Sequence, residues 1–140
     1  MSQFLAFSVR GRALAPLALA AALVTAGSAS AAERETYRLQ GSTVTVIAHD
    51  FLDEQELDTL RLVGTDPQAL ALFMGEGAGH GAIAVAPAQG FIRDGMPAAG
   101  VAALAQLPDA QSARSAALEM CEAERQGGPD CTVVLELAPD

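Results

Sequence analysis

The stretch DAQSARSAALEMCEAERQGGPDCTVVLEL, residues 109–137, decides the C-terminal half of the fold. Asp109 is a suitable helix N-cap, and the alanine-rich sequence after it predicts a long helix to about Gln126. Gly127-Gly128-Pro129 then ends the helix. The apolar run Cys131–Leu137 predicts a final strand. We expect the helix to pack through a stripe of small residues, namely Ala113, Ala116, Ala117, Met120 and Ala123.

The chain has two cysteines, Cys121 near the end of this helix and Cys131 at the start of this strand. In an exported chain such a pair is most simply a structural disulfide, here joining helix to strand across the turn. The alternative is a redox pair, but redox thiols usually occupy a C-x-x-C motif at a helix start. A zinc site is a weaker alternative, because the two cysteines and two histidines lack ligand spacing.

Upstream, the pattern predicts a β-hairpin. Thr36–Leu39 and Thr43–Ala48 flank the turn residues Gln40-Gly41-Ser42. The second segment alternates, with Val44 and Val46 on one face and Thr43, Thr45 and Ile47 on the other.

A short helix is expected next. Asp53 is followed three residues later by Glu56, which is a capping-box pattern, and the helix is predicted to run to Leu62 and to end at Gly64. The following segment, 65–68, contains a proline and indicates a turn.

Two apolar runs, Ala69–Met74 and Ala82–Ala86, enclose a glycine-rich segment. Their lengths and flanking glycines favour two strands of a hairpin, although alanine and leucine leave a helix open for the first. Residues 90–97 indicate a loop with a short extended piece, and 99–107 favours no single element. The predicted fold is therefore α+β, a small antiparallel sheet packed by one long C-terminal helix and one short helix.

The N-terminal 32 residues indicate export. Arg10 and Arg12 precede the apolar run Ala13–Ala26, and small residues follow with possible cleavage near Ala31 or Ala32. The apolar run is shorter than the roughly 20 residues of a spanning helix, so no stable membrane anchor is expected after cleavage. We therefore expect a signal peptide, 1–32, and one small domain, 33–140, in the periplasm or the medium.

The charge composition excludes some functions. The net charge is −9, all eight basic residues are arginine, and lysine is absent. Without lysine, the chain cannot form the Schiff base of a pyridoxal-phosphate or aldolase-type enzyme. Its acidity argues against sequence-independent nucleic-acid binding, which needs many cations. No cofactor is expected, and a protein partner is possible but not identified by the residues.

Candidate chemistry centres on His49, Asp50 and His80. His49 and Asp50 could form a base and its orienting carboxylate, but neighbours in an extended segment point to opposite faces. No nucleophile motif accompanies them. These three residues carry the alternative hypothesis of a minor enzyme or a metal-binding protein.

Two further patterns have simpler interpretations. The segment Gly75–Gly81 resembles a dinucleotide loop, but a strand-like run follows it where a helix is required, so a hairpin loop is expected. The acidic residues of 50–58 lack the spacing of a calcium loop, and charge at a helix start explains most of them. Weak binding of divalent cations remains an alternative.

Three segments together resemble the DUF4189 family of small exported bacterial proteins. They are Gly81–Pro87, Ser112–Cys121 and the residues from Asp130 to Val134, within the last 60 residues or so. The resemblance implies a disulfide-linked strand–helix–strand unit and no chemistry. The chain departs from the family pattern in lacking a tryptophan near the first strand and further cysteines.

The whole mature chain is also similar to small exported proteins of alphaproteobacteria, in segments such as Leu57–Val63 and Gly90–Asp94. Some proteins of this kind carry the label 5-aminolevulinate synthase. The residues contradict that activity, because the enzyme is several times longer and needs a cofactor-binding lysine. We expect a non-enzymatic exported domain that acts as an interaction or envelope-associated module.

Overall fold

The computed structural model describes residues 31–140. The first 30 residues, which hold nearly all of the predicted signal peptide, lie outside this part of the chain. The elements in chain order are β1 (Glu33–Leu39), β2 (Ser42–Ala48), α1 (Glu54–Thr65), α2 (Pro67–Met74), β3 (His80–Val85), β4 (Ile92–Arg93), β5 (Met96–Pro97), β6 (Ala102–Leu107), α3 (Ala110–Glu124) and β7 (Thr132–Pro139).

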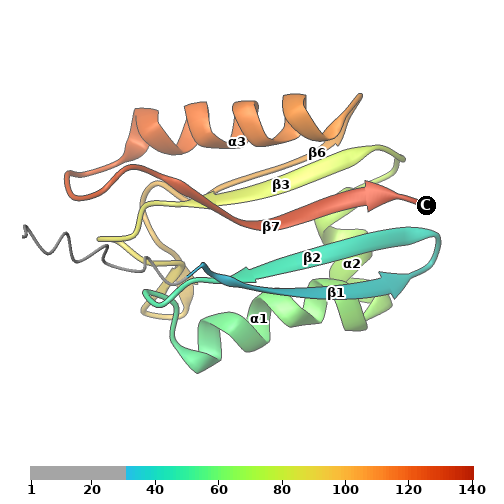
Figure 1. Ribbon diagram of the computed structural model, residues 1–140, viewed down its shortest axis with the longest axis horizontal. Helices are drawn as coiled ribbons and strands as arrows, with labels where there is room; N and C mark the ends of the chain where they lie inside the picture. Colours follow the sequence, from blue (N-terminus) through green and yellow to red (C-terminus); the bar gives the residue numbers. More distant parts are fainter. Residues whose placement is uncertain (1–30) are drawn as a thin grey trace, which may run out of the picture.

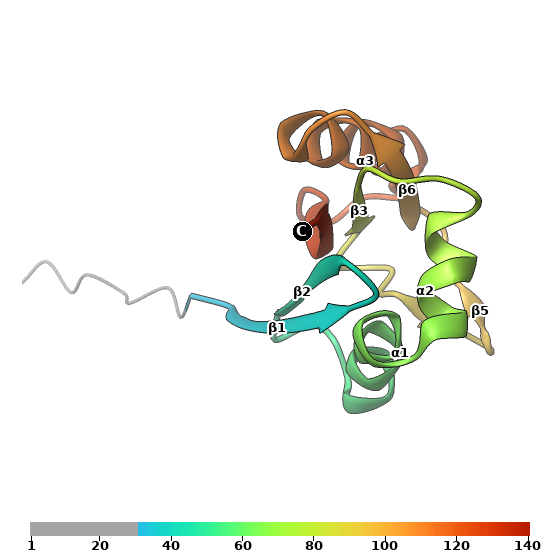
Figure 2. The same cartoon turned by 90° about the vertical axis from the view of Figure 1, so that its right-hand side faces the viewer.

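The fold is α+β, as predicted, and its centre is a five-stranded antiparallel sheet. The strand order is β1-β2-β7-β3-β6, so β1 and β6 form the two edges. Helix α3 lies on one face of this sheet, and α1 and α2 lie on the other (Figures 1 and 2). The strands β4 and β5 form a separate two-stranded ribbon.

The predicted hairpin is confirmed. β1 pairs with β2 in an unbroken register in which Thr36 lies opposite Thr45. The two-residue turn uses Gln40 at φ 50° and Gly41 at φ 74°, the left-handed conformations that a type I′ hairpin turn requires. The alternation predicted for β2 also holds, because Val44 and Val46 are fully buried.

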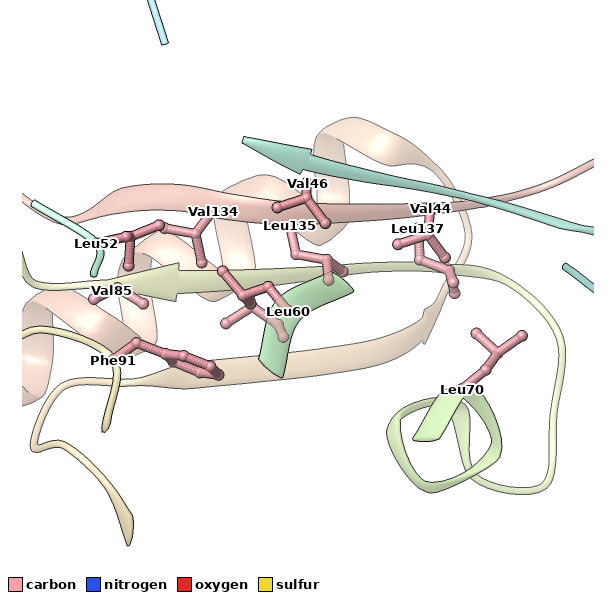
Figure 3. Close-up of a cluster of buried hydrophobic side chains, with 11 residues drawn as sticks. Val44, Val46, Leu52, Leu60, Leu70, Val85, Phe91, Val134, Leu135 and Leu137 are labelled. Carbon is pink, nitrogen blue, oxygen red and sulfur yellow. The ribbon is translucent and has the colours of Figure 1, made fainter. Parts of the chain in front are cut away.

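The main core lies between the sheet and α1 and α2. Its fully or nearly fully buried side chains come from five elements and from the two loops that hold Leu52 and Phe91, and Figure 3 shows this cluster: Val44, Val46, Leu52, Leu60, Leu70, Ile83, Val85, Phe91, Val134, Leu135 and Leu137. At about 2 kcal/mol for each large side chain removed from water, this cluster dominates the hydrophobic stabilisation.

The second core lies beneath α3 and is built from small residues. Alanines of β3 and β6 meet Ala113, Ala117 and Cys121, which recur every four positions along α3. The predicted stripe is therefore wrong in part. Ala113 and Ala117 are buried, but Met120 is half exposed and Ala123 is exposed, because the helix is rotated toward Cys121. α3 is also shorter than predicted, at 15 residues.

Helix α1 begins as the sequence predicts. The Asp53 carboxylate accepts from the Glu56 amide and the Glu56 carboxylate accepts from the Asp53 amide, which completes the capping box. The predicted end at Gly64 is wrong, since α1 continues to Thr65. A Cβ added at Gly64 would lie 2.7 Å from the Cβ of Tyr37. The glycine is therefore needed because it lets α1 pack closely against β1, and it does not end the helix.

The predicted strand over Ala69–Met74 is wrong, because this segment forms α2, the alternative that the composition left open. The Asp66 carboxylate accepts from the amides of Gln68 and Ala69, both at 2.8 Å, and Pro67 occupies the first helical position. These are strong helix-start features. The glycine-rich segment therefore links a helix to β3 instead of two strands, and two short helices replace the one expected.

An ion-pair network ties α1 to β1. Arg61 donates from Nε and Nη2 to the two carboxylate oxygens of Glu35, each at 2.8 Å, and from Nη1 to Glu54 and Asp58. The Tyr37 hydroxyl donates to Glu35 at 2.6 Å. The Arg61 hydrogen bonds, reinforced by Tyr37, lower the pKa of Glu35 from 4.5 to about 2.

This lowered pKa predicts acid sensitivity. Because the folded-state pKa lies below the unfolded value, Glu35 contributes stability that is fully present above pH 4.5 and is lost as the pH falls toward 2. NMR titration of the Glu35 carboxyl carbon should give a midpoint near 2. Tyr37→Phe removes one donor and keeps Arg61, so it should raise this midpoint in part. A midpoint near 4.5 in the unaltered protein would contradict the network.

Candidate functional site

The structure joins Cys121 of α3 to Cys131 in a disulfide, as predicted. The two Cα atoms are 6.1 Å apart, Cys121 is fully buried and Cys131 is 8% exposed. Both sulfurs are packed among the alanines beneath α3. The bond thus ties the end of the helix to the start of β7 inside a core, where it is shielded from solvent.

Polar contacts hold the turn that the disulfide closes. The Glu122 carboxylate accepts from the Cys131 amide at 2.6 Å and from Arg125 Nε at 2.6 Å, and Arg125 Nη1 donates to the Gly128 carbonyl. The Cys131 amide, together with Arg125, lowers the pKa of Glu122 below its ordinary value. The turn between the two cysteines is therefore held by hydrogen bonds of Glu122 and Arg125.

The three residues of the enzyme hypothesis do not converge on one pocket. His49 Nε2 lies 3.0 Å from the Val133 carbonyl, and its ring stacks on Phe51. His80 opens β3 near the opposite end of the sheet, and the register separates it from His49 by roughly 15 Å along the strands. Asp50 is exposed in the turn after β2.

The acidic segment 50–58 has partners within the protein. Asp53 and Glu56 form the capping box, and Glu54 and Asp58 bind Arg61. Among residues 31–140 no three histidine, cysteine or acidic side chains are grouped as metal ligands would be. The Gly75–Gly81 segment leads into a strand, and a dinucleotide loop requires a helix there.

Glu56 also has a second role that sequence reasoning missed. Its side chain is 3% exposed, and Oε1 accepts from the amides of Phe91 and Ile92, each at 2.9 Å, and from Arg93. Burial alone raises the pKa of this carboxyl. The hydrogen bonds from the amides of Ile92, Asp53 and Phe91, together with Arg93, lower the pKa by more than burial raises it, so the net shift is downward. One carboxylate thus fixes both the start of α1 and the loop before β4.

The face of the sheet that carries α3 is only partly covered, and a groove runs beside the helix. Two hollows, of about 100 Å³ and about 380 Å³, meet at Glu136 of β7. We call this the Glu136 groove. Its lining includes Thr43 and Thr45 of β2, Arg34 of β1, Arg114 of α3 and His49.

The Glu136 groove holds two positive groups and one negative group. Glu136 binds Arg114 Nε at 2.6 Å and Arg34 Nη1 at 3.4 Å, so two guanidinium groups flank one carboxylate. Arg34 and Arg114 remain substantially exposed, and Thr43 and Thr45 line one of the two hollows. The outward threonines of β2 were the only sequence signal for it, since the arginines come from distant elements.

Comparison with known proteins assigns no family: no protein-family model, curated protein or solved structure matches the chain. Within residues 31–140, none of the helices has the length and apolar character needed to cross a bilayer.

Proposed function

We propose that the protein is a small exported, non-enzymatic interaction module whose fold is locked by the Cys121–Cys131 disulfide. The observation that carries this proposal is the disulfide itself, buried in the alanine core and closed over a polar turn. Such structural bonds persist in oxidising compartments and are rare where thiols are kept reduced.

The N-terminal sequence supports the same destination. A basic start, an apolar run and small residues before Glu33 are the parts of a secretory signal peptide. The mature chain, 33–140, then keeps all seventeen acidic residues and six of the arginines. The resemblance to the DUF4189 family is in keeping with export and assigns no reaction.

The interaction role is supported by the arrangement of polar residues. His49, Asp50 and His80 lie apart, whereas the Glu136 groove presents two substantially exposed arginines beside partly buried threonines. This arrangement favours binding a partner over positioning a reacting group.

Export is tested by expressing the full-length chain in a bacterium with a C-terminal tag and fractionating the cells. We expect periplasmic or secreted protein that starts near Ala32 or Glu33, with no thiol available for alkylation in denaturant. The matched control lacks residues 2–26 and should stay in the cytoplasm with two alkylatable thiols. Full-length chain in the cytoplasm with two free thiols would overturn the proposal.

A further inference from the structure

We propose that the larger hollow of the Glu136 groove binds an organic carboxylate between the guanidinium groups of Arg34 and Arg114. This hollow, of about 380 Å³, is called the Arg34 hollow, and its lining includes Ile47, His49 and Val133. The carboxylate belongs either to a small free acid or to the C-terminus of a partner chain, and the chemistry of binding is the same for both. The inference rests on the proposed interaction role, because it names the ligand for that role, but it does not depend on export.

The hollow is open because α3 covers only part of its face of the sheet. Helix α3 packs over β3, β6 and β7, and β1 and β2 extend beyond it (Figure 2). Arg34 of β1 lies directly opposite Ile47 of β2, and residues opposite each other in an antiparallel pair share a face. Since Val44 and Val46 face the main core, Ile47 and Arg34 lie on the α3 side of the sheet.

Glu136 brings the two arginines together from different elements. It lies on β7 opposite Thr45, two strands away from β1, and its carboxylate binds Arg34 Nη1 at 3.4 Å and Arg114 Nε at 2.6 Å. A guanidinium has five N–H donors, and within residues 31–140 these ion pairs are the polar contacts of the two groups. Their side chains are 61% and 45% exposed, so most of the donors can reach a ligand.

Positive charge is in excess at this hollow, although the chain is acidic. Arg61, Arg93 and Arg125 each bind at least one carboxylate that no other arginine binds. Arg34 and Arg114 instead share a single carboxylate, which leaves one net positive charge between them. A carboxylate ligand supplies the missing negative charge and can accept two parallel hydrogen bonds from one guanidinium.

The acids that are close in sequence do not fill the hollow. Glu33 and Glu35 alternate with Arg34 along β1 and therefore point to the other face, where Glu35 binds Arg61. Asp50 is exposed in the turn after β2 and does not line the hollow. More distant acids are screened at physiological salt, where the Debye length is about 8 Å, so the local charge decides whether an anion binds.

The floor of the hollow favours an organic anion over an inorganic one. Ile47, which is 6% exposed, and the partly buried Val133 provide apolar contacts beside the arginines. Small-molecule sites usually combine such apolar walls with a few polar groups. A phosphate dianion would bring two charges close to Glu136 and would gain nothing from the floor, whereas a monocarboxylate with a short hydrocarbon part uses both features.

The expected processing of the chain changes the same hollow. Ala31 and Ala32 also line it, and cleavage before Glu33, one of the expected positions, removes both. The hollow then becomes wider on this side, and the new α-ammonium group of Glu33 lies next to Arg34 in the sequence. Both changes favour an anionic ligand, so we expect the mature chain to be the form that binds.

Binding is tested by NMR on oxidised mature protein, residues 33–140, at constant ionic strength. With sodium hexanoate as the probe, the Nε–Hε signals of Arg34 and Arg114 should shift most, with a dissociation constant of about 1 mM. Acetate, which lacks most of the hydrocarbon part, should bind at least about fivefold more weakly. Hexanamide, which has the same skeleton without the charge, should not bind, and sodium phosphate should bind more weakly than hexanoate.

A second pair of probes identifies the source of the carboxylate. A tetrapeptide that ends in leucine is titrated with a free C-terminus and as its C-terminal amide, and only the free form should bind. If it binds more tightly than hexanoate, the ligand is the C-terminus of a partner chain; if it does not, the ligand is a small acid. Either result supports the carboxylate site.

Arg114→Gln and Arg34→Gln should each raise the dissociation constant of hexanoate at least about tenfold. Arg38→Gln is the matched control, because it removes the same charge from the same face of β1, opposite Thr43 and outside the hollow. It should change the constant less than about twofold. Circular dichroism and thermal unfolding confirm that each variant is folded.

Three results would overturn the inference. They are the absence of any shift at the two arginines with about 20 mM of either probe, binding of hexanamide or phosphate as tight as that of hexanoate, and equal weakening by Arg38→Gln and Arg114→Gln. Any of them in a protein that fractionation places outside the cytoplasm would remove this ligand and leave export intact.

Discussion

Replacing Glu56 with alanine is expected to lower the free energy of unfolding by about 4 kcal/mol, a large part of the stability of a domain of this size. The Glu56 carboxylate is 3% exposed and accepts from the amides of Asp53, Phe91 and Ile92. Its removal leaves these donors without their partner, and the donors at 91 and 92 lie where the loop enters the core.

Glu56→Gln removes the negative charge of the side chain but keeps its size, so it measures the contribution of the charge to stability. Glutamine keeps one carbonyl oxygen, which can accept from Phe91 and Ile92, but its amide nitrogen then faces the amide of Asp53 and cannot accept from it. One capping bond is lost and the others lose their charge assistance, so we expect a decrease of about 2 kcal/mol. Urea unfolding of both variants measures these changes.

Glu54→Gln is the matched control, because Glu54 lies in the same helical turn but its side chain is 76% exposed and binds only one branch of the Arg61 network. Its effect should stay below about 1 kcal/mol. Hydrogen exchange adds a local readout, since the Phe91 and Ile92 amides should lose protection in Glu56→Ala and keep it in Glu54→Gln. Equal effects at Glu54 and Glu56 would contradict the assigned role.

The pH dependence has a defined sign. Because the pKa of Glu56 is lowered in the folded protein, the carboxylate stabilises the fold at neutral pH, and this contribution is lost as the pH falls through the folded-state pKa. Glu35 acts in the same direction on β1. Acid should therefore loosen α1 from both β1 and the loop that precedes β4.

The role of Glu56 illustrates the limits of sequence reasoning. The capping box with Asp53 could be predicted because its two residues are three positions apart. The partners Phe91 and Ile92 are 35 and 36 positions away, and no local pattern reports that a carboxylate will be buried against them. Local signals likewise predicted the first hairpin, the start of α3, the final strand and the disulfide.

The two main errors have different causes. Ala69–Met74 was expected to be a strand because an apolar run bounded by glycines fits either a buried strand or a buried helix. Asp66 and Pro67, an N-cap followed by a first-position proline, were the signals that identify α2. The sequence around Gly64 predicts a helix end, because the close contact of Gly64 with Tyr37 is tertiary and no local pattern indicates it.

Removal of the disulfide is the second large effect. Cys121→Ala with Cys131→Ala should lower the free energy of unfolding by about 3 kcal/mol, because an open chain gains the entropy that closure of an eleven-residue loop had removed. The corresponding fall in melting temperature is about 15 °C for a domain of this length. Alanine is the suitable replacement, because both cysteines already pack among alanines. A serine at either position would instead bury a hydroxyl group.

Chemical reduction provides the matched comparison. A reductant should destabilise the unaltered protein to about the level of the double alanine variant and should leave that variant unchanged. If the free energies of unfolding of the oxidised and reduced forms of the unaltered protein differ by less than about 0.5 kcal/mol, the disulfide does not stabilise the fold. The redox interpretation then gains support.

The rate of reduction also distinguishes a structural disulfide from a redox-active pair. Attack by an external thiolate needs access to a sulfur. Cys121 is fully buried, and Cys131 is held in place because its backbone amide donates a hydrogen bond to the Glu122 carboxylate. Reduction should therefore be slow and should accelerate with urea, in step with opening of the α3–β7 turn. Glu122→Gln weakens the turn and keeps both cysteines, so it should speed reduction without removing the disulfide. Rapid reduction of the native protein, independent of urea, would instead indicate an accessible catalytic bond.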